Sequence, residues 1–236
     1  AEGGRDYNTA EISEYTLRNI YLPPFKAAVE AGAASVMSAF NEIGGVPAVA
    51  NRWLLTEVLR DEWGFDGPVV SDWDAVGELI FHGVAENARE AAAIGLQSGV
   101  DIDMASNAYL PHLPDLVQSG VVSEACIDEA VRRVLRLKMR LGLFDNPYVD
   151  ETASASAQFT APHQKAVLEL ARRSLVLLKN EASLLPLGQR FKKVGLFGNL
   201  ASARRELFGT WTLDGVDSDV VTIEESLRSH LGGCEI

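Results

Sequence analysis

Residues 67–78 read GPVVSDWDAVGE, an apolar strand that runs directly into a group of polar side chains. Val69 and Val70 are β-branched residues typical of a buried strand, whereas Ser71, Asp72 and Trp73 follow without an intervening loop. In parallel α/β folds, functional groups lie where the strands end on their carboxyl side. The stretch therefore predicts either a functional carboxylate at position 72 or an aspartate that merely caps a turn.

The bulk composition restricts the classes of partner. The chain has 236 residues, 47% of them hydrophobic, and a formal net charge of −12. Because an acidic surface repels phosphate groups, we expect no nucleic-acid partner and no anionic membrane, and a neutral substrate fits better. No apolar run approaches the roughly 20 residues that span a bilayer, and no signal-peptide pattern is visible in a chain that begins with Ala1.

Helical and strand patterns alternate from Ala1 to Asp145. Pro23 and Pro24 predict a break between two helices over 11–31, the second ending at Gly32. The other expected elements are a buried strand at 35–40, a helix from Asn51 to Gly64, a strand ending at Asp72, a helix at 86–98, a strand at 100–104, a helix near 110–119 and a long helix opened by Ser123. Strands separated by helices indicate parallel pairing with right-handed crossovers.

A change of composition predicts the domain organisation. Residues 146–160 are small and polar, which indicates a linker between residues 1–145 and 161–236. Beyond it we expect a helix at 162–173, a strand at 193–200 and a helix at 223–231, whereas periodicity leaves 175–179 unassigned. Three strands before the linker are too few to close a barrel, so we expect this sequence to be a section of a longer chain.

Three polar residues follow predicted strands, and most strand-end aspartates are structural. Asp72, Asp103 and Asn41 hold such positions. For Asp103 and the neighbouring Asp74, a cap or loop hydrogen bond is the favoured interpretation. Asp72 differs because Trp73 follows it: the apolar face of a pyranose stacks on an indole while a carboxylate faces the anomeric carbon. The pattern suggests a sugar site.

Ordered segments along nearly the whole chain resemble a known family. They are AEGGRDYNT, YLPPFKAAVEAGAASVMSAFN, NRWLLTEVLRDEWGFDGPVVSDW, SGVDIDM, LGLFDNPY and ARRSLVLLKNEASLLPL. Together they resemble glycoside hydrolase family 3, of the bacterial β-glucosidase type. The resemblance implies an α/β fold in which residues 1–145 are the C-terminal part of a (β/α)8 TIM barrel and residues 161–236 begin an α/β sandwich domain.

The same resemblance implies a mechanism. The aspartate of the family's SDW motif, Asp72 here, is the nucleophile of a retaining, exo-acting β-glucosidase that releases terminal non-reducing β-D-glucosyl residues through a covalent glycosyl-enzyme. The family's acid/base glutamate is expected beyond residue 236, since Glu206, Glu224 and Glu225 do not match its position. The family's sugar-binding Lys-His pair is expected just before Ala1.

The resemblance also assigns substrate-binding residues. Trp73 and Trp211 correspond to the two walls of the family's aglycone slot, although Trp211 has a buried core aromatic as its alternative interpretation. Phe40 stands where many members carry a tyrosine, and a phenyl ring cannot donate the hydrogen bond of that tyrosine. Arg5 either lines the sugar pocket or braces its loop by an ion pair with Glu2, and we favour bracing.

Several alternatives stay open at this stage. The protein could be a β-xylosidase or another exo-β-glycosidase of the family, or a non-catalytic carbohydrate-binding relative. No cofactor is expected because the leaving group is activated by protonation alone. No metal site is expected, since His82, His112, His163 and His230 lack ligand spacing, and no GxSxG elbow indicates an esterase. The family suggests a periplasmic or secreted location, and the oligomeric state is left open.

Overall fold

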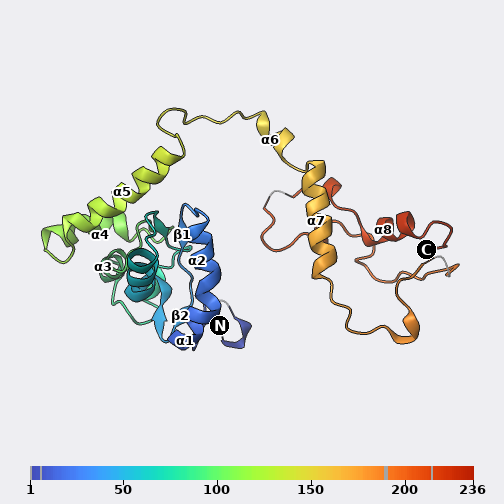
Figure 1. The fold of residues 1–236 in the computed structure, drawn as a ribbon, viewed down its shortest axis with the longest axis horizontal. Coiled ribbons are helices and arrows are strands. Elements are labelled where there is room, and N and C mark those ends of the chain that lie inside the picture. Colours follow the sequence, from blue (N-terminus) through green and yellow to red (C-terminus); the bar gives the residue numbers. More distant parts are fainter. Residues whose placement is uncertain (1, 6, 189–190, 214) are drawn as a thin grey trace. The chain divides into compact units, whose positions relative to one another are not determined.

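The computed structural model describes residues 2–5, 7–188, 191–213 and 215–236, which form two compact units, Ala1–Asp150 and Glu151–Ile236. Figure 1 shows the first unit from blue to green and the second from yellow to red. Both are rich in helix, and the first carries the parallel strands of an α/β fold. Within the described ranges, no helix has the length and apolar character needed to span a membrane.

Among its described residues, the first unit combines helices of 3 to 17 residues with four two-residue strands. Its helices are η1 Glu2–Gly4, α1 Glu14–Thr16, η2 Leu17–Tyr21, α2 Leu22–Glu30, η3 Ala48–Ala50, η4 Trp53–Glu62, η5 Gly77–Leu79, α3 Ala88–Ser98, α4 Tyr109–Gln118 and α5 Glu124–Arg140. Its strands are β1 Val36–Met37, β2 Glu42–Ile43, β3 Val46–Pro47 and β4 Val69–Val70.

The strands form a parallel ladder and a separate hairpin. β1 pairs with β4 in parallel, with Val36 opposite Val69, and Val70 forms a further parallel bridge with Ile102. Parallel pairing across the intervening helices was predicted and is confirmed. The hairpin β2–β3 was not predicted. Its turn contains Gly44 and Gly45, whose φ angles are 58° and 79°. Two successive positive φ angles are what a two-residue hairpin turn requires.

The predicted break at Pro23 and Pro24 is wrong. The helix continues from α1 through η2 into α2, and the wider π-type turn of η2 precedes the prolines. The Leu22 amide bonds the Leu17 carbonyl, five residues back, so the ladder is already shifted where the proline rings enter. The predicted end of the helix is confirmed by Gly32, whose φ is 94°.

The predicted helix boundaries near η4 and α3 are confirmed by their caps. Asn51 Oδ1 accepts a hydrogen bond from the Leu54 amide at 3.0 Å. Gly64, whose φ is 70°, ends that helix. Asn87 Oδ1 accepts from the Glu90 amide, which is 3.1 Å away, and Gly99 closes α3 with a left-handed φ of 111°. These signals are local, so sequence alone could locate them.

The predicted strands are shorter and less covered than expected. Residues 35–40 do not form a fully buried strand, because Met37 is 50% exposed and only Ser38 is buried among its neighbours. Residues 100–104 contribute a single bridge through Ile102 instead of a strand, and residues 193–200 contribute only the bridge between Lys193 and Glu235. The apolar face of α5 is also uncovered, since Leu135 is 43% exposed.

The core of the first unit lies between the parallel ladder and the helices that follow its strands. It combines Val69 and Val100 with side chains of η4, α3 and α4, among them Leu59, Leu96 and Leu116. Gly67 lies where the chain turns into β4, and a Cβ there would lie 2.3 Å from the Ala34 carbonyl oxygen. The close approach leaves room for glycine only.

The second unit has helices but no extended strand among its described residues. They are α6 Ala153–Ala157, α7 Ala161–Ser174, η6 Glu181–Ser183, η7 Arg205–Leu207, η8 Asp217–Asp219 and α8 Ile223–His230. Thr160 caps α7, and Thr222 and Glu225 form a reciprocal capping box on α8. Both predicted helices are confirmed, and the unassigned residues 175–179 are irregular. The two cysteines of the chain, Cys126 in the first unit and Cys234 in the second, are unpaired.

Candidate active site at the carboxyl end of the parallel strands

Asp72 leaves β4 at the carboxyl end of the ladder. Hydrogen bonds hold the residues around it: the Ser71 amide donates to the Ile102 carbonyl at 2.9 Å, and the Met104 amide donates to Ser71 Oγ at 2.8 Å. Asp72 itself is half-buried, and its Oδ1 accepts from the Trp73 amide at 2.7 Å. The neighbouring strands therefore fix the backbone at Asp72 while its carboxylate retains access to solvent.

Trp73 presents its indole to solvent beside that carboxylate. Its side chain is among the exposed aromatics of the first unit, with 68% of its surface accessible. The backbone turns at once after it, since Asp74 adopts a left-handed φ of 57° and its amide donates to the Met104 carbonyl. An exposed indole next to an accessible carboxylate is chemically able to stack a sugar ring and contact its reactive carbon.

The residues after Trp73 form a tight series of turns that carries a third acidic side chain. The Ala75 amide bonds the Asp72 carbonyl, and the Glu78 amide bonds the Asp74 carbonyl. Burial raises the pKa of Glu78; the negative charges of Asp74 and Asp72 act in the same direction, and His82 opposes them. The site thus combines the accessible carboxylate of Asp72 with a neighbouring carboxyl group, Glu78, whose pKa is raised.

Asp103 has the structural role favoured by the sequence. Its Oδ2 accepts from the Ala108 amide at 2.7 Å and from the Tyr109 amide at 3.3 Å, so it caps the start of α4. Asn41 also makes a loop contact, since its Nδ2 donates to the Asn8 carbonyl at 2.9 Å. The Asp72 carboxylate, by contrast, bonds the amide of the very next residue, which leaves it available to a substrate.

A cluster that the sequence did not reveal joins β2 to the turns that follow Asp72 and to the amino-terminal segment. Glu42 Oε1 lies 2.6 Å from His82 Nδ1, and Glu42 Oε2 accepts from Thr9 Oγ1 at 2.9 Å. These hydrogen bonds lower the pKa of Glu42, the Thr9 bond contributing most. Glu42 lies 33 positions from Thr9 and 40 positions from His82, so no local sequence pattern links these residues. In the sequence, His82 is only a histidine without metal-ligand spacing.

A buried charged network lies at the opposite, amino end of β4. Asp101 is 1% exposed and accepts from Arg60 at 2.7 Å, Arg133 at 2.8 Å and the Val69 amide at 2.8 Å. Burial lowers the pKa of Arg60, although Asp101 opposes that shift. Holding the strand in place is the physical role of this network, because it binds the first residue of β4, three positions before Asp72.

The remaining predicted site residues are distributed over both units. Phe40 packs against the core and its ring centroid lies 4.3 Å from that of Tyr7. Arg5 is exposed, and the side chain of Glu2, its expected partner, lies outside the described residues. Trp211 belongs to the second unit and is 88% exposed in this section of the protein; its place in a substrate slot stays a prediction.

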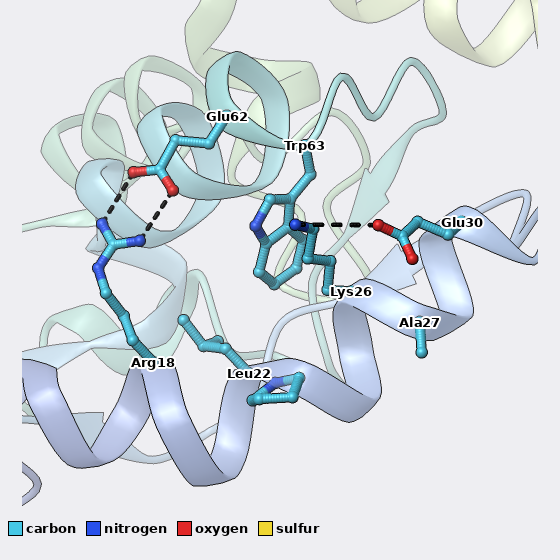
Figure 2. A pocket seen from close by; sticks show the side chains of 8 residues that line it. Arg18, Leu22, Lys26, Ala27, Glu30, Glu62 and Trp63 are labelled. Atoms are coloured by element: carbon cyan, nitrogen blue, oxygen red, sulfur yellow. Dashed lines mark hydrogen bonds and ion pairs between the residues drawn. The ribbon is translucent and has the colours of Figure 1, made fainter.

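A pocket of about 360 Å³ lies away from this site, on the outer helices (Figure 2). Leu22 and Trp63 form its apolar floor, Arg18 reaches Glu62 through two 2.8 Å bonds, and Lys26 faces Glu30. The residues that line the pocket belong to η2, α2 and the end of η4, and none of them is among the residues around Asp72. The charged side chains of the pocket form ion pairs with one another, and the Arg18–Glu62 pair links the continuous helix η2–α2 to η4.

The described residues contain no group of three or more histidine, cysteine, aspartate or glutamate side chains arranged to hold a metal ion. The features above define the class: an α/β protein whose site lies at the carboxyl ends of parallel strands and presents a carboxylate beside an aromatic ring.

Comparison with known proteins makes the assignment specific. The model of the glycosyl hydrolase family 3 N terminal domain matches residues 1–137. A periplasmic beta-glucosidase of Salmonella typhimurium is 41% identical over 241 residues, covering 98% of this chain and 31% of that protein. A beta-xylosidase of Formosa agariphila is 38% identical over 251 residues, covering 96% of this chain and 35% of that protein.

Solved structures agree. The crystal structure of beta-glucosidase from Listeria innocua in complex with glucose has a TM-score of 0.89 and 41% identity, covering all of this chain and 32% of that one. The chain thus spans about a third of the length of the relatives it matches. It belongs to glycosyl hydrolase family 3, which confirms the resemblance seen in the sequence.

Proposed function

We propose that the full-length protein is a retaining, exo-acting β-glucosidase that removes terminal non-reducing β-D-glucosyl residues. Asp72 attacks the anomeric carbon, the aglycone oxygen departs with a proton from a second carboxyl group, and water then hydrolyses the glycosyl ester on Asp72. The second carboxyl group is assigned to a glutamate outside this sequence. Retaining chemistry requires the two carboxyl groups to lie roughly 5–5.5 Å apart.

The observation that carries the proposal is the half-buried carboxylate of Asp72 at the end of β4, beside an indole that is 68% exposed. A nucleophilic carboxylate must be accessible and held in place, and the Trp73 amide donates a hydrogen bond to Asp72 Oδ1 at 2.7 Å. Trp73 forms one wall of the aglycone slot. Trp211 supplies the other, while Phe40 and Arg5 line or support the sugar pocket.

The relatives support a carbohydrate substrate. Solved structures of the Listeria innocua β-glucosidase are complexes with glucose, with isofagomine and, in an aspartate-to-alanine mutant, with laminaribiose. By the same likeness we assign residues 1–145 to the C-terminal part of a (β/α)8 barrel, 146–160 to a linker and 161–236 to the start of an α/β sandwich. The periplasmic relative supports a periplasmic or secreted location.

A β-xylosidase is the second candidate, because a relative of that name is 38% identical over almost the whole chain. Glucose and xylose differ by one hydroxymethyl group, and the residues that would contact it are not distinguished by the site described above. Comparing kcat/KM for an aryl β-glucoside with that for an aryl β-xyloside decides between them. A higher value for the xyloside contradicts the β-glucosidase proposal and leaves the role of Asp72 intact.

The proposal is tested by Asp72→Asn in the full-length protein. The amide keeps the shape and removes the charge, so sugar binding should persist while turnover falls by several orders of magnitude. Asp115→Asn is the control, because Asp115 is an exposed carboxylate on α4 that pairs with Arg89 at 2.6 Å. Turnover in Asp72→Asn equal to that of the control would show that Asp72 is not the nucleophile, and absence of turnover in the unmodified protein would favour a non-catalytic sugar-binding role.

A further inference from the structure

The Glu42 carboxylate is the junction of three chain segments. One oxygen pairs with His82 Nδ1 at 2.6 Å and the other accepts from Thr9 Oγ1 at 2.9 Å. The side chains of His82 and Glu42 are only 15% and 21% exposed, so the pair is largely shielded from water. An interaction with that degree of burial holds its geometry better than an exposed ion pair does.

The first segment joined at Glu42 is the amino-terminal loop. The Ala10 amide donates to the Glu42 carbonyl at 2.8 Å, and the Gly44 amide donates to the Ala10 carbonyl at 3.1 Å. Thr9 adds its side-chain bond to the Glu42 carboxylate. The loop therefore remains attached through backbone bonds if the carboxylate is removed, which means that the carboxylate is not needed merely to keep this loop in place.

The segment on the other side starts at Asp72. Successive backbone bonds run from the Ala75 amide to the Asp72 carbonyl, from Glu78 to Asp74 and from His82 to Glu78. The residues from 72 to 82 are thus a continuous series of turns with Asp72 at one end and His82 at the other. The His82 side chain reaches β2, the strand that follows β1 in the chain, through its contact with Glu42.

We propose that Glu42 and His82 are a positioning pair for the nucleophile: their contact closes the loop after β4 onto the loop after β1 and thereby orients Asp72 toward the sugar. This inference rests on the proposed function. Since β1 and β4 are adjacent parallel strands, the pair links two neighbouring loops at the same end of the ladder. Neither side chain touches the substrate; both act through the backbone that carries Asp72.

The charged groups around the pair are consistent with this role. Glu78 faces His82 from within the same turns and feels the charges of Asp74 and Asp72 as well. Glu42 makes the hydrogen bond to His82, whereas Glu78 lies beside His82 within the same turns. Removing the Glu42 side chain removes the hydrogen bond that holds His82 to β2. The turns from residue 72 to 82 then lose their fixed distance from β2.

The test uses Glu42→Ala, His82→Ala and the double variant in the full-length enzyme. A fluorinated glucoside first counts the active sites that become labelled, and kcat is then expressed per labelled site. Each single variant should lower kcat per site on the order of tenfold to hundredfold, the cost of a small misplacement of a reacting group. The double variant should lose no more than either single one, because the two residues act as a unit.

The conservative variant His82→Asn separates positioning from charge. An asparagine amide can place a donor where Nδ1 lies, so it should recover a large part of the kcat lost in His82→Ala. Asp115→Ala, which removes a 2.6 Å ion pair on α3 and α4, should leave kcat per site unchanged.

Two results would overturn the inference. One is an unchanged kcat per labelled site in Glu42→Ala, including a loss confined to the number of labelled sites, which indicates a folding role; the other is additive losses in the double variant. Failure to label Asp72 in the unmodified enzyme would instead remove the proposed function beneath it.

Discussion

Replacing Asp101 by alanine tests how the buried network holds the strand that bears Asp72. The Asp101 side chain is 1% exposed and that of Arg60 is 9% exposed, so the substitution leaves a buried guanidinium without its counterion. The Val69 amide also loses its acceptor at 2.8 Å. Arg133, which is 21% exposed, can recover water in part.

The magnitude follows from these burials. Removing one partner of a buried, hydrogen-bonded ion pair costs about 3–5 kcal/mol. Arg60 keeps its bonds to the Gly67 and Gly99 carbonyls, at 3.0 and 3.1 Å, which places the expected loss toward the lower end of that range. Asp101→Asn should cost less, because the amide oxygen still accepts one bond.

The assay is urea unfolding of the full-length protein. The free energy of unfolding is measured for the transition that is sensitive to Asp101→Ala. Asp66→Ala is the matched control, because Asp66 pairs with Arg140 at 2.6 Å while both side chains are half-exposed. Loss of an exposed pair of this kind should cost only about 0–1 kcal/mol. Equal losses for the two variants would refute the reasoning, since burial would then not determine the cost.

Three further predictions concern single positions. A Cβ on Gly67 would lie 2.3 Å from the Ala34 carbonyl oxygen. Gly67→Ala should therefore destabilise the protein by about 1–3 kcal/mol, measured by chemical unfolding, and no loss would show that this turn has room for a methyl group. The pKa of Glu42 is lowered from its ordinary value of 4.5, so its stabilising effect is present above that value and is lost as the pH falls through the lower pKa of the folded state. The Tm difference between the unmodified protein and Glu42→Gln should therefore shrink as the pH falls below 4.5, and a difference that grows on acidification would contradict this sign. Trp73→Ala should raise KM for aryl glucosides roughly tenfold through the loss of stacking. The change in stability should be smaller because the ring is 68% exposed, and an unchanged KM would exclude the indole from the aglycone slot.

Local signals in the sequence were sufficient where one or two residues determine the backbone. Asn51, Gly64 and Gly99 locate helix ends because a capping side chain or a positive φ acts within a single turn. Pro23 and Pro24 led to a wrong prediction because only their local effect could be considered. The π-type turn of η2 shifts the hydrogen bonds that the proline rings would otherwise break, and no residue pattern predicts that turn.

Longer-range contacts were beyond reach of the sequence for a different reason. Glu42 and His82 come into contact because the segments that follow β1 and β4 lie at the same end of the ladder. The residues adjacent to each of them in the sequence carry no signal that predicts this contact. Asp72, by contrast, could be selected from the sequence because the strand, the carboxylate and the indole are adjacent along the chain. The two-strand hairpin could have been found from Gly44 and Gly45 between β-branched residues.

The covalent intermediate provides the most direct test of the central claim. The full-length enzyme is trapped with a 2-fluoro glucoside, digested, and the labelled peptide is sequenced by mass spectrometry. The account predicts a glycosyl group esterified to the carboxylate of Asp72, within the peptide that carries SDW. A glycosyl label on any other side chain, or rapid turnover with no trapped ester, would contradict it.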